Sequence, residues 1–485
     1  EYLEPGDTFT TNTFLRELSV GGKAGYRFSP GNQVEAGVNY FNDRRGRGME
    51  IYEIDGAWDS HETWMSNARY EGSKGKVSWQ LLAFSLDEHF ERLNEYMSEA
   101  EYNLYRVESK RVDRGVTFSA ETAAGRFQSV SGGMDYRYGS VFGQDIYYTS
   151  TDLITNQGKM DTWGLFVQDE IRLMEQKLQI TAGLRFTMAR FHDGSFIVDN
   201  PSYSIQYLTS YQDTLFGADR WSQIDPKLSA QYRFTPFSRV YLSLARGFRA
   251  PILDDLCRTG KMRKGFKVAN PSLKPEYLDN IEIGGDVRLF QKVQVATSLF
   301  YSIGHDFMYY VSTGDTVNMG FKRSPVFKKQ NISKVTIAGF EADINAELWP
   351  WLSLTGNYTF NHSMISKFIP NDTAIDKDLS NKYLTDVPDH KVTCGLTIKH
   401  KIVNFNMVWK YIGERYINDE NTVDYYLKTD KYPSYNTLGA RVWRTFLKHY
   451  TFAFNIDNIF DVRYIDDRLR ESPGRQMNVE FTITF

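Results

Sequence analysis

The chain has 485 residues, of which 24% are charged, with a net charge of −3 and a mean hydropathy of −0.47. This balance argues against a nucleic-acid-binding protein, because it provides no excess of basic residues. No run approaches the roughly 18–20 consecutive apolar residues that a membrane-spanning helix needs. Aromatic residues nevertheless reach 15% of the chain. A polar average with many aromatic residues fits either a large soluble β protein or a membrane β-barrel.

Apolar and polar residues alternate along many segments, which predicts strands with one apolar and one polar face. The clearest are residues 178–188 (LQITAGLRFTM), 240–244 (VYLSL), 450–457 (YTFAFNID) and 477–485 (MNVEFTITF). Their polar positions include Arg, Glu and Asp at mid-strand, which the dry core of a β-sandwich would not accept without partners. We therefore expect the apolar face, up to Phe485, to meet lipid.

Short turns and long excursions follow one another along the chain. The short turns are SPGN (29–32), GSKG (72–75), AAGR (123–126), MEQK (174–177), TPFS (235–238), FQK (290–292), WPW (349–351), HK (400–401) and LKH (447–449). The longer excursions include 43–61, 143–160, 193–219, 247–275, 311–328, 365–382 and 417–432. This pattern predicts about 19 strands with segments of roughly 10–18 residues between turns. Short turns at one end and long loops at the other are the signature of an outer-membrane barrel. A propeller would show a repeat of about 40–50 residues, and the sequence shows none.

The parity of the strands gives a second expectation. Barrels made of a single bacterial chain have an even number of strands, with both termini on the periplasmic side. An odd count that begins at the outer face predicts at least one further strand upstream, with residues 1–12 as the end of an extracellular loop. No secretory signal peptide is visible at Glu1.

Several motifs occur in an order that resembles one family. GLFVQDE (164–170) followed by LQITAGLRF resembles a strand pair of TonB-dependent outer-membrane receptors. PKLSAQYRFTPFSRVYLSLARGFRAP (226–251) resembles the passage into their FRAP box, and NIFDVRY (458–464) and PGR (473–475) resemble their closing region. The FRAP box is Phe248, Arg249, Ala250 and Pro251, and the NPxL box is Asn270, Pro271, Ser272 and Leu273.

This resemblance implies an all-β fold, a transmembrane antiparallel barrel of 22 strands, of which about 19 are present here. Residues 1–485 would then form the receptor barrel, and the N-terminal plug domain and the first strands would lie upstream, since residues 1–60 match neither the plug nor its TonB-contact segment. The implied function is outer-membrane import of a scarce nutrient, such as a ferric siderophore, haem, cobalamin or a similar metal chelate. The implied partners are the TonB–ExbB–ExbD complex through the absent plug, outer-membrane lipid and lipopolysaccharide, the chelate itself and a possible surface lipoprotein.

A basic segment between the two boxes is the first candidate binding site. It contains Arg258, Lys261, Arg263, Lys264 and Lys267. Fixed positive charge could attract an anionic chelate, although such a loop could equally contact lipopolysaccharide phosphates or be solvated. Haem receptors of the family carry a histidine iron ligand in this interval. The present chain has none there, which disfavours haem and leaves Cys257 and Met262 as its only soft ligands.

Other candidates have simpler structural readings. Tyr309 and Tyr310 could stack on a planar ligand or belong to the aromatic belt at the membrane interface. Tyr425 and Tyr426 lie in the middle of a long loop, where a belt role is less natural, and are also candidates for ligand binding. The remaining residues considered are expected to be hydrogen-bonded, solvated or inert: His362, His390, Asp372, Asp376, Asp378, Cys257 and Cys394.

Two rival functions share the barrel. A passive porin-like channel would lack the plug, and a glycan importer of the SusC type would work with a surface lipoprotein lid. An outer-membrane enzyme is disfavoured, because GxSxG, HExxH and Walker motifs are absent from the sequence. We predict no catalytic residues, no bound metal, no cofactor and no nucleic-acid partner.

Overall fold

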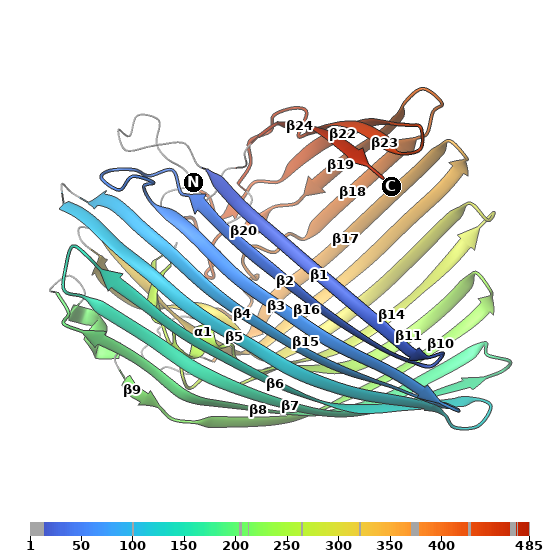
Figure 1. Ribbon diagram of the computed structural model, residues 1–485, viewed down its shortest axis with the longest axis horizontal. Coiled ribbons are helices and arrows are strands. Elements are labelled where there is room, and N and C mark those ends of the chain that lie inside the picture. Colours follow the sequence, from blue (N-terminus) through green and yellow to red (C-terminus); the bar gives the residue numbers. More distant parts are fainter. Residues whose placement is uncertain are drawn as a thin grey trace.

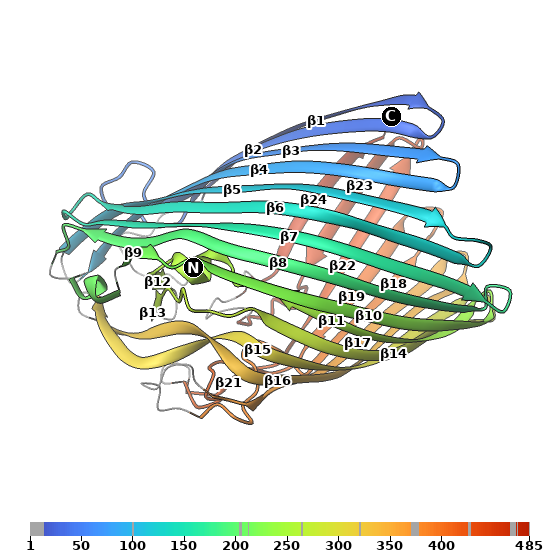
Figure 2. The ribbon, with the colours of Figure 1, turned by 90° about the horizontal axis from the view of Figure 1, so that it is seen from below.

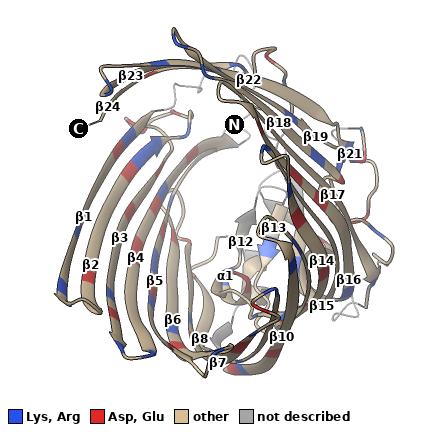
Figure 3. Cartoon of the chain, turned by 90° about the vertical axis from the view of Figure 1, so that its right-hand side faces the viewer, with Lys and Arg blue, Asp and Glu red and all other residues tan. Residues whose placement is uncertain are grey.

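The protein is built around one large curled sheet. The computed structural model describes residues 14–98, 101–202, 206–211, 213–262, 265–319, 322–369, 378–424, 428–465, 472 and 474–484. Within these residues the sheet has 22 strands, of which β9, β12 and β13 are short segments in loops, which leaves 19 long wall strands. The predicted count is confirmed. The wall strands pair antiparallel in chain order and wind around a lumen (Figures 1 and 3).

The wall strands are β1 (Leu15–Ser29), β2 (Asn32–Gly46), β3 (Trp58–Lys74), β4 (Val77–Ser98), β5 (Glu101–Ala123), β6 (Gln128–Tyr147), β7 (Leu153–Leu173), β8 (Leu178–Asp199), β10 (Asp219–Thr235), β11 (Ser238–Arg249), β14 (Glu276–Leu289), β15 (Val293–Met319), β16 (Lys322–Trp349), β17 (Leu352–Lys367), β18 (His390–Ile398), β19 (Asn404–Ile412), β22 (Tyr435–Phe446), β23 (Tyr450–Asp457) and β24 (Gln476–Ile483). The loops contain η1 (Gln206–Tyr211), β9 (Asp213–Phe216), α1 (Leu253–Cys257), β12 (Gly260–Met262), β13 (Gly265–Val268), β20 (Arg415–Tyr416) and β21 (Lys431–Tyr432). Neither described helix has the length and apolar character needed to cross a bilayer.

All nine predicted short turns are present. They connect consecutive wall strands at 30–31, 75–76, 124–127, 174–177, 236–237, 290–292, 350–351, 399–403 and 447–449. The turns gather at the right-hand end of the barrel in Figures 1 and 2, and the longer connections gather at the opposite end. This asymmetry places the short turns on the periplasmic side and the long connections on the outer side.

The expected strand length of 10–18 residues is wrong at both ends of the range: β4 to β8, β15 and β16 are longer, and β18, β19, β23 and β24 are shorter. β15 and β16 have 27 and 28 residues, so most of the expected excursion 311–328 is an extended hairpin. The excursion 143–160 is likewise mostly strand, because β6 ends at Tyr147 and β7 begins at Leu153. A hairpin satisfies its own backbone hydrogen bonds and can continue past the membrane, where polar residues on both faces remove the alternation that marked the rest of the strand.

The apolar parity of the strands faces outward, as predicted. Met477, Val479 and Phe481 on β24 are exposed, with Val479 at 77% of its full accessibility, and Leu242 on β11 is exposed on the same outer surface. Phe485 lies outside the described residues. This continuous apolar surface is suited to lipid contact, as in an outer-membrane barrel.

The two ends of the sheet are unpaired edges in the described part of the chain. β1 pairs only with β2, and β24 pairs only with β23. Figure 3, which looks along the barrel, shows these edges facing each other across the open side of the wall. Lipid cannot satisfy the backbone N–H and C=O groups of an open edge. Three further strands between β1 and β24 would complete the expected barrel of 22, and their origin stays a prediction.

Candidate functional site

The segment between the FRAP and NPxL boxes folds into the lumen. We call residues 250–275, which connect β11 to β14, the lumenal insert. It contains α1, β12 and β13, and these elements lie inside the ring of wall strands in Figure 3. α1 packs near β6, β7 and β8, and β13 pairs in parallel with β16. The insert therefore bridges opposite parts of the wall.

An apolar cluster holds the insert against the wall. Leu256, Cys257 and Leu273 from the insert are almost completely buried with Phe191 and Phe196 of β8. Burial of such side chains contributes roughly 1.5–3 kcal/mol each. The insert is thus a packed element rather than a solvated loop.

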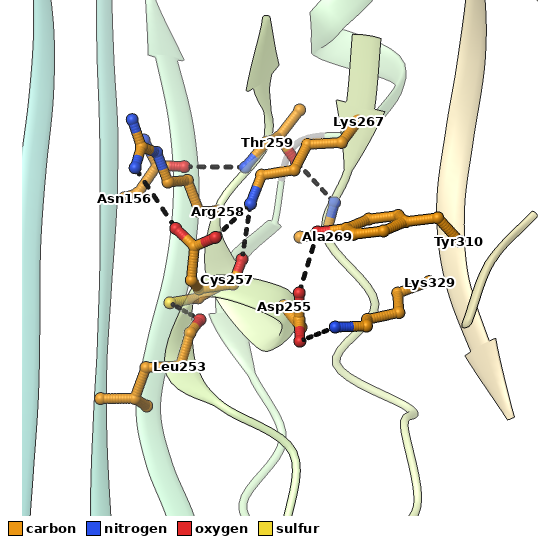
Figure 4. A network of polar contacts seen from close by, with 11 residues as sticks. Asn156, Leu253, Asp255, Cys257, Arg258, Thr259, Lys267, Ala269, Tyr310 and Lys329 are labelled. Atoms are coloured by element: carbon orange, nitrogen blue, oxygen red, sulfur yellow. Dashed lines mark hydrogen bonds and ion pairs between the residues drawn. The ribbon is translucent and has the colours of Figure 1, made fainter. Parts of the chain in front are cut away.

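Asp254 forms ion pairs with two of the predicted basic residues. Its carboxylate accepts a hydrogen bond from Arg258 Nη1 at 3.3 Å and pairs with the ammonium of Lys267, which also donates to the Asp254 carbonyl at 3.2 Å (Figure 4). Burial alone would raise the pKa of Asp254, but the charges of Lys267 and Arg258 hold that pKa below its usual value. Asp254 therefore balances one of the two positive charges of Arg258 and Lys267 and holds both side chains within the insert.

Asp255 ties the insert to the long β15–β16 hairpin. Its side chain is 3% exposed and accepts hydrogen bonds from Tyr310 Oη at 3.0 Å and from Lys329 Nζ at 2.7 Å. The Lys329 ammonium also lies 5.0 Å from the centre of the Tyr310 ring. Figure 4 shows Tyr310 and Lys329 converging on the Asp255 carboxylate. The pair joins segments 74 positions apart in the sequence.

The NPxL box also helps to hold the lumenal insert against the wall. The Asn270 N–H donates to the Asp255 carbonyl at 2.9 Å, and its side-chain amide donates to the Lys329 carbonyl at 2.8 Å. On the opposite wall, the Thr259 N–H donates to Asn156 Oδ1 of β7 at 3.1 Å. Asn270 and Leu273 of the box therefore have structural roles here, one in hydrogen bonding and one in the apolar cluster.

The FRAP box lies at the other end of the insert. Its Arg249 pairs with Glu276 of β14 at 2.5 Å, and Glu276 also accepts the Met308 N–H at 2.7 Å. This ion pair joins the last residue of β11 to the first residue of β14. Phe248 is half-buried and Pro251 is buried.

The other predicted binding residues fall into three groups. The side chains of Lys261, Met262, Arg263 and Lys264, together with Tyr425, Tyr426, Asp372 and Asp376, lie outside the described residues. Tyr309 and Tyr310 are successive residues of β15 and face opposite sides. Tyr310 contacts Asp255, whereas Tyr309 shares a hydrogen bond of 2.9 Å with Thr385 Oγ1. The two tyrosines therefore cannot stack together on one ligand.

The histidines and cysteines have protein partners or are separated. His390 lies 3.0 Å from Tyr358 Oη, and His362 packs edge-to-face on Tyr383. Both cysteines are free thiols, and Cys257 Sγ donates to the Leu253 carbonyl at 3.0 Å. Burial raises the pKa of Cys257 to about 12, which disfavours the thiolate that a soft metal would need. Within the described ranges, no three or more His, Cys, Asp or Glu residues are arranged to hold a metal ion.

Sequence reasoning missed the acidic and amide partners of the insert. Asp254 and Asp255 immediately precede the basic segment, and their position was a usable local signal. Asn156 and Lys329 carried no such signal, because they reach the insert only through the folding of distant strands.

Comparisons with known proteins agree that the chain forms a receptor barrel. The family model described as "TonB dependent receptor-like, beta-barrel" matches residues 2–459. The TonB-dependent heme receptor A of Haemophilus ducreyi is 19% identical over 352 residues, covering 67% of this chain. The present chain spans 45% of that relative's length.

Solved receptor structures share the fold. The ferric yersiniabactin uptake receptor FyuA of Yersinia pestis matches with a TM-score of 0.67 and 15% identity, over 96% of this chain and 69% of that one. The ferric-catecholate import receptor Fiu of E. coli K12 matches with a TM-score of 0.71 and 14% identity, over 99% and 76% of the two chains. The family consists of outer-membrane receptors and transporters rather than enzymes. The chain thus belongs to the TonB-dependent receptor β-barrel family and forms the wall of an outer-membrane barrel.

Proposed function

We propose that the complete protein imports a metal chelate across the outer membrane with energy from TonB. The observation that carries this proposal is the match of the receptor-barrel family to residues 2–459, nearly the whole chain. The names of the similar proteins concern haem, ferric yersiniabactin and ferric catecholates. A ferric siderophore, haem, cobalamin or a similar chelate is accordingly the proposed class of ligand.

The proposal requires parts beyond the described wall. Residues 1–485 would be the barrel, and an N-terminal plug and the first strands would come from upstream sequence. The plug would contact TonB, which is energised through ExbB and ExbD. The exposed apolar band would contact outer-membrane lipid and lipopolysaccharide. A surface lipoprotein would be expected only if the protein were a glycan importer.

The basic and aromatic candidate residues are not equally suited to contacting the ligand in this proposal. Arg258 and Lys267 both pair with Asp254, so they are better suited to holding the insert than to capturing an anion. Tyr310 is similarly engaged by Asp255. Lys261, Arg263, Lys264, Tyr425 and Tyr426 stay candidate ligand contacts.

Uptake of radiolabelled iron chelates by the native bacterium tests the proposal. Deleting the gene should abolish uptake of one chelate, and the full-length gene should restore it only in cells that have TonB and a proton-motive force. Uptake that persists without TonB would instead establish a passive channel. A deletion that affects growth on a glycan but no metal chelate would favour the SusC-type alternative.

A further inference from the structure

The inner wall carries a series of acid–arginine pairs that extends from β3 to β8. The pairs are Asp59–Arg92 at 2.6 Å, Glu88–Arg111 at 3.6 Å, Asp113–Arg137 at 2.7 Å and Asp135–Arg185 at 2.6 Å. They connect β3 to β4, β4 to β5, β5 to β6 and β6 to β8. Figure 3 shows basic and acidic residues recurring across these neighbouring strands.

The register of the sheet places these pairs on the lumenal face. Asn156 of β7 faces the lumen, because its side chain accepts a hydrogen bond from Thr259 of the insert. Asn156 is opposite Gly143, Gly143 is opposite Ser109, and Ser109 is opposite Phe90. Residues opposite one another share a face, and so do residues two apart on one strand. Even-numbered residues of β4 and odd-numbered residues of β5 and β6 therefore face inward along these pairs.

In each pair the guanidinium is more exposed than the carboxylate. The arginine side chains are 37–64% exposed, whereas the acids are 22–28% exposed. The largest difference is at Arg137, which is 64% exposed beside Asp113 at 25%. The acids thus lie against the wall, and the lumen meets mainly guanidinium groups.

A pocket of about 460 Å³ covers the middle two pairs. One side is formed by Glu88, Arg111, Asp113 and Arg137, and the other by residues 250–254 at the start of the insert. Its volume falls within the usual range for small-molecule sites. The insert therefore forms the far wall of a pocket whose near wall presents two arginines.

The pocket lies at or beyond the outer surface of the membrane. On the outer face of the same strands, Asp87 and Arg114 form an ion pair at 3.1 Å. These residues directly neighbour Glu88 and Asp113 in the sequence. An exposed ion pair facing outward is disfavoured within the hydrocarbon layer, so this height of the barrel belongs to the headgroup level or above it. A ligand from outside could reach the pocket before passing the membrane.

The arrangement at Arg137 leaves donors available. Asp113 binds the Nε and Nη2 edge of the guanidinium, and the fork of an arginine provides five N–H donors in all. The remaining edge can receive a second oxyanion while Asp113 keeps the side chain oriented. Guanidinium groups match the planar, two-oxygen geometry of carboxylates particularly well.

We propose that Arg111 and Arg137, backed by Glu88 and Asp113 and facing the lumenal insert, form a binding site for a carboxylate-bearing anionic chelate. This inference rests on the proposed import function and specifies the chemistry of its ligand. The two arginines orient ligand carboxylates, and the neighbouring acids prevent an excess of fixed charge in the unliganded pocket.

Equilibrium binding to the purified full-length receptor tests this site. The probes are ferric citrate, which carries carboxylates, and a ferric trihydroxamate, which carries none. The variant combines E88Q, R111Q, D113N and R137Q, which removes both pairs and leaves the net charge unchanged. The control is R239Q with D286N, which removes an ion pair of similar geometry from β11 and β14 outside the pocket. Heat-modifiable migration on gels verifies that each barrel is folded.

We expect the four-residue variant to weaken ferric citrate binding by at least about tenfold, since the loss of one charge-assisted hydrogen bond typically lowers affinity by more than about tenfold. The control should bind like the wild type, and added salt should weaken wild-type binding. Unchanged ferric citrate affinity in the folded variant overturns the site, as does a wild-type receptor that does not bind ferric citrate. If TonB-dependent uptake of the trihydroxamate persists in either case, the import function stands and only this site fails. If TonB-dependent uptake of every chelate is absent, both fail.

Discussion

Replacing Asp255 with alanine should release the lumenal insert from the β15–β16 hairpin. The substitution leaves the Lys329 ammonium without the Asp255 carboxylate in a site where that lysine is only 17% exposed, and it removes the Asp255 oxygen to which Tyr310 Oη donates. Removing one partner of a buried ion pair typically costs about 3–5 kcal/mol. Because the wall strands have their own pairing, we expect the cost to appear as local opening rather than loss of the barrel.

Hydrogen exchange and limited proteolysis of the full-length protein measure this opening. Amides of residues 253–273 should exchange faster and become cleavable in the variant, while the wall strands stay protected. Two control variants test whether the loss of the buried ion pair causes the opening. Combining Asp255→Asn with Lys329→Gln removes both charges and should restore most protection, and Glu414→Gln breaks an exposed pair with Lys431 that should contribute little. Wild-type protection of the insert in the alanine variant would show that the ion pair does not hold it.

Replacing Gly133 with alanine should prevent normal assembly of the barrel. Gly133 lies on β6, where an added Cβ would come within 2.3 Å of the Phe118 backbone carbonyl and 2.7 Å of the Phe166 ring. The ring can turn, but the carbonyl belongs to the neighbouring strand β5 and can move only if the two strands separate. Overpacking of this kind typically costs about 1–3 kcal/mol, and a backbone clash should reach at least the upper end.

Gly139→Ala on the same strand is the matched control. Its added Cβ would find its nearest neighbour, the Met160 carbonyl, at 4.0 Å, which is ordinary contact. Folded yield from heat-modifiable migration and the midpoint of urea unfolding measure both variants. We expect a marked loss for Gly133→Ala and values close to the wild type for Gly139→Ala. Equal stability of the two variants would contradict the close approach at Gly133.

The wall was predictable because its signals are local. Alternation along segments such as 178–188 and the nine short turns depend on neighbouring residues, and together they predicted 19 strands. The true length of β15 and β16 was not predictable in the same way. Beyond the membrane neither face of a strand has to be apolar, so a paired extension and a loop have similar compositions.

The candidate site was predictable only in part. The basic residues between the boxes were visible, but the partner of Asp255 is Lys329, whose approach depends on the folding of the β15–β16 hairpin. The pair of Asp113 with Arg137 likewise depends on strand register, which shifts every side chain to the opposite face if it changes by one residue. Two arginines 26 positions apart gave no local sign that they share a pocket.

The most direct test of the receptor-barrel account is the intact mass and N-terminal sequence of the protein extracted from native membranes. The unpaired edges of β1 and β24 predict three further strands that close the wall, and the proposed import function predicts a plug, so we expect a longer polypeptide with a few hundred residues before Glu1. A native chain that begins at Glu1 would contradict the account, because it would contain neither the strands that close the barrel nor the plug through which TonB drives import.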